Sequence, residues 1–352
     1  MSEKTIAVLF GGQSSEHDIS CLSVQNVLNH IDPEKYDVLR IGITKEGRWL
    51  AADSVEQIAD GTWRESPVSA ILSPDAVQHG VLLCEDGRVR LQRVDVVFPV
   101  LHGMYGEDGT VQGLLELARI PYVGCGVLAS AVAMDKVYTK LIVEDLSISQ
   151  ARHAVVHRSE LSDEDPVIAR IEALLPYPVF VKPSKAGSSK GVSKAGDREA
   201  LRTALRVAAA EDSKILVEEA ICGRELECGI LGGAEVLASG IGEILPADEF
   251  YSFDAKYNNE DSRTVVSPEL PEGKAEEIRR AAKDIFRAIG GAGIARVDFF
   301  LEDQTNRVIF NEINTLPGFT AISMYTMLWE EQGYSKAELV EALIESAFLG
   351  RD

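Results

Sequence analysis

The sequence has no excess of basic residues: 35 lysines and arginines stand against 56 acidic residues, giving a formal net charge of -21. Nucleic acids and anionic membranes attract basic surfaces, so this balance argues against both as general partners. Long apolar runs are also missing, since no stretch reaches the ~18 residues that a membrane-spanning helix requires. No segment near the first residue has the basic and apolar parts of a signal peptide. We therefore expect a cytoplasmic protein whose phosphate sites are only locally basic.

Cysteine is scarce as well. The five cysteines are odd in number and scattered, without the paired spacing that is typical of metal sites. This pattern favours reduced thiols, as in a cytosol. The first glycine pair, Gly11-Gly12, lacks the spacing of a dinucleotide fingerprint, and the later Gly/Ser loop lacks the order of a Walker A motif. The sequence therefore does not support a P-loop nucleoside triphosphatase.

What the sequence does contain is the composition of a globular protein. It has 352 residues, of which 45% are hydrophobic and 26% charged. A chain of this length and composition can form two or three domains with substantial cores, without disulfide bonds.

Short apolar runs that end in glycine-rich loops occupy the first third of the chain. Thr5–Phe10 runs into Gly11–Ser20, and Asp95–Leu101 runs into His102–Gly109. Together with Val38–Ile43, these runs predict buried parallel strands with helices between them. A plain strand–helix connection explains the first loop, and substrate binding at the carboxyl end of the first strand is the alternative.

The middle of the chain contains a further loop, rich in glycine and serine. Glycines within 120–126 predict a domain boundary, and a helix is expected over Ala129–Leu146. Lys136 on this helix would ordinarily be a solvated lysine. A later strand ends at Lys182 and opens into a loop of glycine and serine, residues 183–192. Such a loop can close over phosphates with its backbone donors, and an exposed hairpin turn is the alternative.

The last third contains one segment without periodicity. Residues 247–266 are polar with scattered aromatics, which is typical of a lid or binding element, and simple disorder is the alternative. Leu226–Leu231 before it predicts a strand, and 272–289 after it predicts a strongly amphipathic helix. Ser335 and Glu338 have the spacing of a capping box, so a helix should begin there.

The stretch Gly293–Phe319 is predicted to form a β-hairpin with acidic residues on one face and a turn at about Glu302–Arg307. Asp298, Glu312 and Asn314 offer the oxygen ligands that Mg²⁺ prefers, and phosphates usually complete its coordination. A nucleotide is therefore the natural partner, although the solvated face of an ordinary sheet is the alternative. The residues expected on the acidic face are Arg296, Asp298, Phe300, Val308, Phe310, Glu312 and Asn314.

Eight segments, taken in chain order, resemble the D-alanine–D-alanine ligases of the ATP-grasp superfamily. They are GGQSSEHDIS, LHGMYGEDGTVQG, MDK, VKPSKAGSSKGV, EEAICGRE, FDAKY, RVDFF and NEINTLPGFT. The resemblance implies a three-domain ATP-grasp architecture of α/β and α+β class with an N-terminal open parallel α/β sheet. The implied division is 1–125 for the substrate-binding domain, 126–217 for the central subdomain with the Gly/Ser loop, and 218–352 for the C-terminal subdomain with the metal site and lid.

The resemblance also implies a reaction. In such ligases ATP phosphorylates the carboxylate of one D-alanine, and the amino group of a second attacks the acyl phosphate, releasing ADP and phosphate. Two Mg²⁺ or Mn²⁺ ions, held by Asp298, Glu312 and Asn314, would neutralise the phosphates. The product would be D-alanyl-D-alanine for peptidoglycan precursors, and the family suggests a homodimer.

Positions that match the nucleotide site of the family lie in several of these segments. Lys136 and Lys182 would contact ATP phosphates, and Lys256 would reach the γ-phosphate. Glu218 would face the adenine amino group, and Glu225 the ribose hydroxyls. The full set that the resemblance implies at ATP is Lys136, Lys182, Ser188, Ser189, Glu218, Glu219, Ile221, Glu225, Phe250 and Lys256.

Other matching positions concern the amino acid substrates. Glu16 would pair with the ammonium group of the first D-alanine, and His102 would lie near its carboxylate. Arg296 and the amide of Gly318 would stabilise the oxyanion of the tetrahedral intermediate, where negative charge develops. The residues with implied catalytic roles are Glu16, Ser188, Tyr257, Arg296 and Gly318.

Specificity depends on a few of these positions. Ser188 and Tyr257 match a pair that links the Gly/Ser loop and the long loop to Glu16, as a positioning network without a covalent step. Ser323 and Met324 match contacts to the second substrate, and Tyr257 with Met324 favours D-alanine there. A ligase that joins D-alanine to D-serine or D-lactate is the alternative. A non-catalytic nucleotide-binding regulator is disfavoured, because the implied metal ligands and Arg296 are all present.

Overall fold

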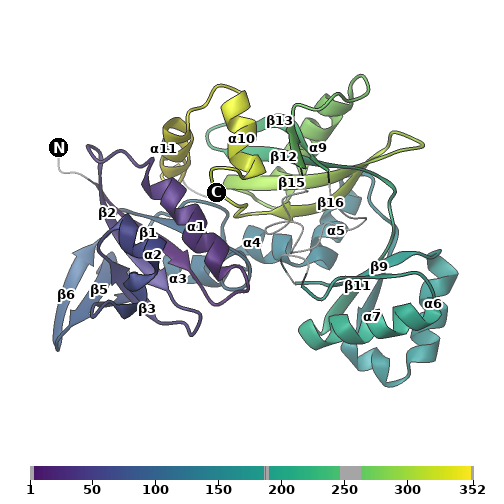
Figure 1. Ribbon diagram of the computed structural model, residues 1–352, viewed down its shortest axis with the longest axis horizontal. Coiled ribbons are helices and arrows are strands. Elements are labelled where there is room, and N and C mark those ends of the chain that lie inside the picture. Colours follow the sequence, from purple (N-terminus) through teal and green to yellow (C-terminus); the bar gives the residue numbers. More distant parts are fainter. Residues whose placement is uncertain (1–3, 186, 188–189, 246–262, 350–352) are drawn as a thin grey trace.

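The computed structural model describes residues 4–185, 187, 190–245 and 263–349. Within these residues the chain forms three sheets that follow one another along the long axis of the molecule (Figure 1). The sheet of the first third lies at one end, a four-stranded sheet lies at the other, and a five-stranded sheet lies between them. None of the helices in the described part of the chain has the length and apolar character needed to span a bilayer.

The first sheet is built around strand β1, whose residues Ile6–Phe10 are completely buried. It lies parallel to β2 on one side and β7 on the other, which confirms the predicted parallel strands. Alternate β1 side chains enter two cores, Val8 on the side of helix α1 and Leu9 on the side of helix α3. The elements are β1 (Lys4–Gly11), α1 (His17–Leu28), β2 (Tyr36–Ile43), β3 (Trp49–Ala52), α2 (Val55–Asp60), the 3₁₀ helix η1 (Thr62–Glu65), β4 (Ser69–Leu72), β5 (Gly80–Glu85), β6 (Arg88–Arg93), β7 (Val96–Leu101) and α3 (Thr110–Ala118).

Between β2 and β7 the structure differs from the prediction of helices alone. Strands β3 to β6 extend the sheet in antiparallel order to β6-β5-β4-β3-β2-β1-β7. The turn between β5 and β6 is Asp86-Gly87, and both residues have positive φ, 48° and 73°. This dipeptide is a strong hairpin signal, because both central positions of a type I′ turn require positive φ. The antiparallel hairpin could therefore have been predicted from the sequence.

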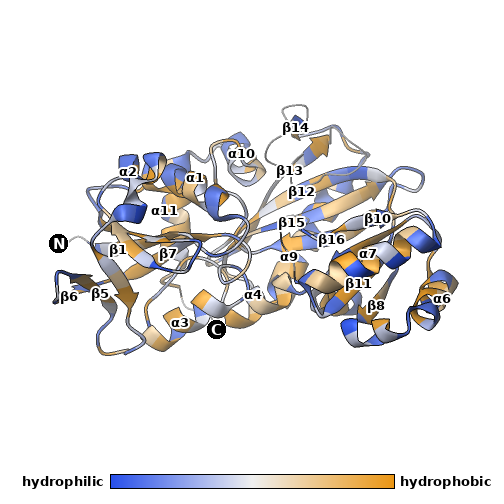
Figure 2. Ribbon diagram, turned by 60° about the horizontal axis from the view of Figure 1, so that its bottom comes forward, coloured by the Kyte–Doolittle hydropathy of each residue, from blue (hydrophilic) through white to orange (hydrophobic). Residues whose placement is uncertain are grey.

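The four-stranded sheet has the order β10-β9-β11-β8 and is antiparallel throughout the described residues. Helices α6 and α7 are amphipathic, with alternating hydrophilic and hydrophobic segments in Figure 2. Their apolar residues share one core with the strands, Ile168 from α6 and Leu205 from α7 packing with Val181 of β9. The elements are β8 (His153–His157), η2 (Arg158–Ser162), α6 (Glu164–Leu174), β9 (Val179–Pro183), β10 (Ser193–Ala195), α7 (Arg198–Glu211) and β11 (Lys214–Glu219).

The five-stranded sheet has the order β14-β13-β12-β15-β16. The predicted apolar stripe of helix α9 is confirmed, since Ile278, Ile285 and Phe286 are fully buried in the core of this sheet. Residues 263–266 of the predicted lid form edge strand β14, and the rest of that lid lies outside the described residues. The elements are β12 (Gly223–Gly232), β13 (Val236–Leu245), β14 (Arg263–Val266), α9 (Lys274–Ala288), β15 (Gly293–Glu302), β16 (Val308–Asn314), α10 (Met324–Glu331) and α11 (Lys336–Ser346).

The last helix packs against the first third of the chain. α11 starts with the predicted capping box of Ser335 and Glu338, which is confirmed by both hydrogen bonds of the motif. Its buried residues Leu343 and Ile344 belong to the same core as Ile6 in β1. Figure 1 shows α11 close to α1, although the two helices come from opposite ends of the chain. The first sheet and the C-terminal helices therefore share one core.

The single helix predicted over Ala129–Leu146 is wrong: the chain forms two helices, α4 (Val127–Met134) and α5 (Lys136–Asp145). Asp135 between them has extended backbone, with φ -91° and ψ 98°, and its side chain caps α5. Its carboxylate also accepts a 2.6 Å hydrogen bond from Ser184 and lies 2.6 Å from the ammonium of Lys214. These contacts come from the residue that follows β9 and from β11, and periodicity within one segment does not reveal them.

We expect Asp135→Ala to lower the free energy of unfolding by about 2 kcal/mol or more, because it removes a helix cap and leaves Lys214 without its carboxylate. Urea denaturation measures the loss. Ser335→Ala is the matched control, since Ser335 caps α11 at an exposed position, and its loss should be about 1 kcal/mol. Equal losses for the two variants would show that Asp135 is an ordinary cap.

Candidate active site

A cavity of about 620 Å³ opens where the four-stranded and five-stranded sheets meet. Strands β9 and β11 contribute to one wall, β12, β15 and β16 to another, and Glu16 and Glu107 reach it from the first third of the chain. Most of the predicted site residues that the structure describes line this cavity. They are Glu16, Lys136, Lys182, Glu218, Glu219, Ile221, Glu225, Arg296, Asp298, Glu312 and Asn314.

The β15–β16 hairpin places the predicted acidic residues together. Asp298 lies directly opposite Glu312, and Arg296 lies opposite Asn314. A β-bulge follows, because Phe299 pairs with Phe310 and Asn311 is left over. A bulge shifts the alternation of side chains by one residue. The acidic face is therefore confirmed for Arg296, Asp298, Glu312 and Asn314.

The same bulge makes part of the predicted face wrong. Val308 and Phe310 join the hydrophobic core together with Phe299 and Leu301 of β15, although Phe310 also borders the cavity, as Phe300 does. A bulge depends on how two strands pair, so alternation within one strand does not reveal it.

Arg296 is the centre of a buried ion network on this face. Its guanidinium donates to both oxygens of Asp298 at 2.7 Å and lies 3.2 Å from Glu227 Oε2. Burial lowers the pKa of Arg296, but the carboxylates of Asp298 and Glu227 outweigh it and hold that pKa well above its usual value. Arg296 is therefore a permanent cation at the cavity wall. Glu227 was not predicted, because only the pairing of β12 with β15 brings it beside Arg296.

Asp298, Glu312 and Asn314 have the chemistry of a site for a hard divalent cation. Asn314 donates from its side-chain amide to Asp298 Oδ2 at 3.0 Å, so the three side chains are within reach of one another. Within the described residues no group of three or more His, Cys, Asp or Glu is arranged to hold a metal ion. The set here has two carboxylates and one amide, and an amide oxygen is a donor that Mg²⁺ also accepts.

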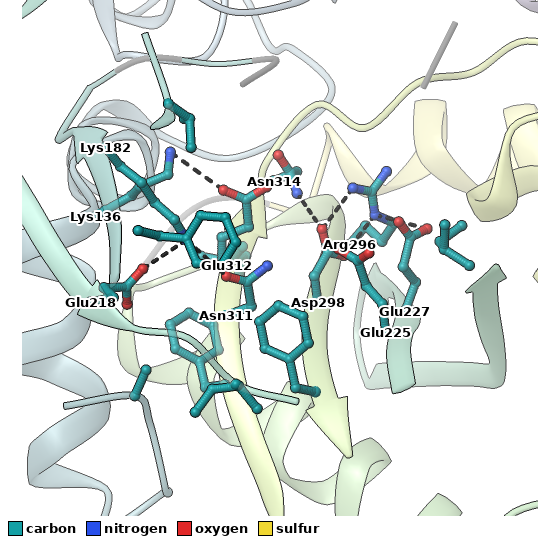
Figure 3. A pocket seen from close by; sticks show the side chains of 18 of the residues that line it. Lys136, Lys182, Glu218, Glu225, Glu227, Arg296, Asp298, Asn311, Glu312 and Asn314 are labelled. Atoms are coloured by element: carbon teal, nitrogen blue, oxygen red, sulfur yellow. Dashed lines mark hydrogen bonds and ion pairs between the residues drawn. The ribbon is translucent and has the colours of Figure 1, made fainter. Parts of the chain in front are cut away.

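Lysines lie at the other end of the cavity, with the acidic residues between them and Arg296 (Figure 3). Lys136 of α5 lies 3.3 Å from Glu312 Oε2. Lys182 of β9 lies 2.7 Å from Glu218 Oε2, and Lys140 lies 2.6 Å from Glu218 Oε1. Lys140 was not predicted, although its spacing of four residues from Lys136 places both on one side of α5.

The two lysines hold Glu218 in its charged form. Burial raises the pKa of Glu218, but the ammonium groups of Lys182 and Lys140 outweigh it and lower the pKa of this carboxyl to about 2. Burial likewise lowers the pKa of Lys182, and the Glu218 carboxylate more than compensates and raises it. Glu218 and Lys182 are therefore ionised at neutral pH.

This ion cluster should make the fold sensitive to acid. Because the pKa of Glu218 is lowered in the folded state, its stabilisation is complete above the ordinary value of 4.5 and is lost as the pH falls towards 2. We expect Glu218→Gln to lower the free energy of unfolding by about 3 kcal/mol at neutral pH, since two buried lysines lose their partner. Urea denaturation at several pH values should show that the difference in free energy of unfolding between Glu218→Gln and the unchanged protein becomes smaller as the pH falls from 4.5 to 2. A difference that stays constant over this window would contradict the assignment.

Glu16 reaches the cavity from the N-terminal position of α1, where it is 8% exposed. Two glycines leave room for its carboxylate. A Cβ atom at Gly103 would lie 2.7 Å from Glu16 Oε2, and one at Gly187 would lie 2.9 Å from the same oxygen. Gly103 also has a φ of +68°, which disfavours a side chain independently. The loops at Gly103 and Gly187 therefore meet at Glu16.

The turn after β16 is held by residues of the first third. His102 Nδ1 is 2.9 Å from the carbonyl of Leu316, and Glu107 accepts the Leu316 N–H at 3.0 Å. Glu107 also accepts the N–H of Gly103 at 2.7 Å. Glu107 was not predicted, but it lies in the same GEDG loop as the glycines that were noted, and a carboxylate there is suited to bind exposed backbone N–H groups.

The remaining predicted residues do not line the cavity or are not described. Ser323 begins α10 and accepts from the N–H of Thr320 at 2.9 Å, close to Gly318. Met324 is buried in a cluster with Ile244 and Leu328, and of these three residues Ile244 lines the cavity. His102 is buried beside the turn. The predictions for Ser188, Ser189, Phe250, Lys256 and Tyr257 lie outside the described residues.

Two antiparallel sheets that enclose lysines, a basic arginine and oxygen ligands in one cavity define an enzyme of the ATP-grasp class. The family model for the N-terminus of D-ala D-ala ligase matches residues 5–125, and the model for its C-terminus matches residues 142–345. The chain belongs to the D-alanine–D-alanine ligase family.

Similar proteins agree with this assignment. The chain is 49% identical to the D-alanine–D-alanine ligase of Acetivibrio thermocellus, an alignment that covers 98% of this chain and 96% of that protein. The solved structure of the VanG D-Ala:D-Ser ligase from Enterococcus faecalis has a TM-score of 0.89 at 36% identity, covering 98% of this chain and all of that one. The D-alanine–D-alanine ligase from Coxiella burnetii has a TM-score of 0.87 at 34% identity, covering 99% and 94%.

Proposed function

We propose that the chain joins two D-alanine molecules to D-alanyl-D-alanine at the expense of ATP, through an acyl phosphate, for peptidoglycan precursor synthesis. One observation carries the proposal. A single cavity contains two lysines suited to phosphates, the buried Arg296 and the carboxylate of Glu16, which is suited to an ammonium group. These are the charges that the transfer of a phosphoryl group from a nucleotide to the carboxylate of an amino acid requires.

At the nucleotide end, Lys136 and Lys182 neutralise the phosphates of ATP, which two anionic reactants need before they can approach each other. Both lysines line the cavity, where a ligand can reach them. Each is also paired with a carboxylate, Lys136 with Glu312 and Lys182 with Glu218. Glu218 accepts a hydrogen bond from the adenine amino group and Glu225 accepts from the ribose. Further contacts to the nucleotide are assigned to Glu219, Ile221, Ser188, Ser189, Phe250 and Lys256.

At the amino acid end, Glu16 binds the ammonium group of the first D-alanine, and His102 lies near its carboxylate. The second D-alanine attacks with its amino group beside Arg296 and the amide of Gly318, which stabilise the oxyanion as it forms. His102 and Glu107 hold the carbonyl and N–H of Leu316, and so orient the turn that carries Gly318. Ser188 and Tyr257 close the site over the acyl phosphate and keep water out, and Ser323 and Met324 border the second substrate.

Two divalent cations, Mg²⁺ or Mn²⁺, are part of the proposal. Asp298, Glu312 and Asn314 would hold them, and the ions would supply neutralising charge to the phosphates. The support is the chemistry of the donor set, which contains only oxygen ligands on one face of the hairpin.

We propose the same division of the chain as the family resemblance implies, 1–125, 126–217 and 218–352. Three separate sheets support a division into three parts, although β11 (Lys214–Glu219) of the four-stranded sheet extends past the proposed boundary at 217. We further propose that the protein is a cytoplasmic homodimer without a nucleic acid or membrane partner. The net charge of -21 supports the absence of these two kinds of partner.

A product assay tests the function. The protein is incubated with ATP, Mg²⁺ and each of D-alanine, L-alanine, D-alanine with D-serine, and D-alanine with D-lactate, and the products are identified by mass. We expect D-alanyl-D-alanine as the main product and phosphate release that depends on D-alanine. Phosphate release that D-alanine does not increase would refute the proposal. Mixed products with D-serine or D-lactate as the main outcome would favour the alternative ligases.

A further inference from the structure

Lys140 is a buried lysine to which the mechanism above gives no role. It lies on α5, one helical turn after Lys136, and its side chain is 1% exposed. Its ammonium lies 2.6 Å from Glu218 Oε1, while Lys182 lies 2.7 Å from Glu218 Oε2. One buried carboxylate therefore forms ion pairs with two lysines, one at each oxygen.

The two lysines differ in their access to a ligand. Lys182 lines the cavity, its side chain is 17% exposed, and its ammonium also lies 3.5 Å from Asn311 Oδ1. Lys140 is not among the residues that line the cavity in the described part of the chain, and it stays behind Glu218. A ligand in the cavity can therefore engage Lys182 but not Lys140.

This difference matters because a buried carboxylate is costly to leave without a cation. If Lys182 were the sole partner of Glu218, a phosphate that drew Lys182 away would leave Glu218 unpaired. With Lys140 in place, Glu218 remains paired whichever way Lys182 turns.

We propose that Lys140 is a positioning residue that serves as the resident counterion of Glu218 and so leaves Lys182 available for the phosphates of the nucleotide. The inference rests on the proposed use of ATP. It predicts that Lys140 affects the part of nucleotide affinity that comes from the phosphates more than the part that comes from the nucleoside. Without Lys140, Glu218 keeps its charge through Lys182 and can still accept a hydrogen bond from the adenine amino group.

The test compares two ligands in the full chain by isothermal titration calorimetry with Mg²⁺: adenosine, and a non-hydrolysable ATP analogue. In Lys140→Met, Lys182 is the one cation that remains on Glu218 among the described residues. We expect affinity for the ATP analogue to fall about tenfold, the loss of roughly one charge-assisted contact, while affinity for adenosine changes by less than about threefold. Lys140→Arg keeps the positive charge and should restore most of the affinity for the analogue.

A matched control separates this role from support of the fold. Arg202→Met removes a cation from another carboxylate cluster, where Arg202 lies 2.8 Å from Glu164, and neither residue lines the cavity. It should lower the melting temperature without changing the ratio of the two affinities. If Lys140→Met does not fold, Lys140→Gln replaces it, because glutamine keeps a hydrogen-bond donor for Glu218. We expect the same change in the ratio of the affinities for the ATP analogue and adenosine.

Three results would overturn the inference. Equal losses for adenosine and the analogue would mean that Lys140 only supports the fold, and unchanged affinities would mean that it has no role in binding. Failure of Lys140→Arg to restore affinity would exclude a role as counterion. If the unchanged protein bound neither ligand, the proposed use of ATP would itself be wrong, which is a separate outcome.

Discussion

Glu312→Gln will lower kcat by about 10²–10³ while leaving the fold intact. Glutamine has the same shape as glutamate, so the hairpin can keep its register, but the negative charge opposite Asp298 is lost. The proposed site needs that charge to hold divalent cations at the phosphates, and losing one electrostatic group of this kind typically costs about 3 kcal/mol or more in the transition state. Steady-state kinetics with saturating ATP and D-alanine measures the effect.

The control for this variant is Glu302→Gln on the same hairpin. Glu302 ends β15, pairs with Arg307 at 3.0 Å and does not line the cavity. Its kcat should stay within about twofold of the unchanged protein, as expected for surface charge changes away from a site. Retention of most activity by Glu312→Gln would show that the assignment of the metal ligands is wrong.

Arg296→Lys will lower kcat by about 10²–10³, because a single ammonium does not reproduce a guanidinium that holds Asp298 with two hydrogen bonds and faces a developing oxyanion. The positive charge remains, so most of the stability should remain as well. Arg296→Met, in contrast, removes the cation that Asp298 and Glu227 share and should lower the free energy of unfolding by about 3–5 kcal/mol.

Paired measurements of kcat and urea denaturation separate the two effects. If Arg296→Lys lost stability as severely as Arg296→Met, the low activity would reflect unfolding and not the oxyanion. Arg202→Lys is the control for the chemical change itself, since Arg202 also pairs with carboxylates at 2.8 Å but lies in the α6–α7 layer away from the cavity. Its kcat should be close to that of the unchanged protein. A large loss of kcat in Arg202→Lys would remove the support for a special role of Arg296.

Local patterns predicted the elements that the site needs. Alternation in Gly293–Phe319 was sufficient to place Asp298 with Glu312 and Asn314, because side chains in a strand point to opposite faces at every step. The apolar stripe of α9 and the capping box of α11 were predicted for a similar reason, since helical period and cap chemistry act within a few residues. These features depend on neighbours in the chain, so the sequence contains the information directly.

Two of the errors have one cause in common. The bulge at Asn311 arises where β16 pairs with β15, and the helix break at Asp135 arises where Ser184 and Lys214 contact it. Both are decided by contacts with residues of another segment. A pattern confined to one segment contains no information about such contacts.

The sequence by itself determined the acidic hairpin, the strands that end in glycine-rich loops and, through the shared order of its motifs, the resemblance to a ligase family. Only the tertiary structure decided which charges meet. It paired Glu218 with both Lys140 and Lys182, placed Glu227 beside Arg296, and joined Glu107 to Leu316. The reason is physical: a buried charge needs a partner of opposite sign, and that partner is chosen by the packing of three sheets and not by distance along the chain.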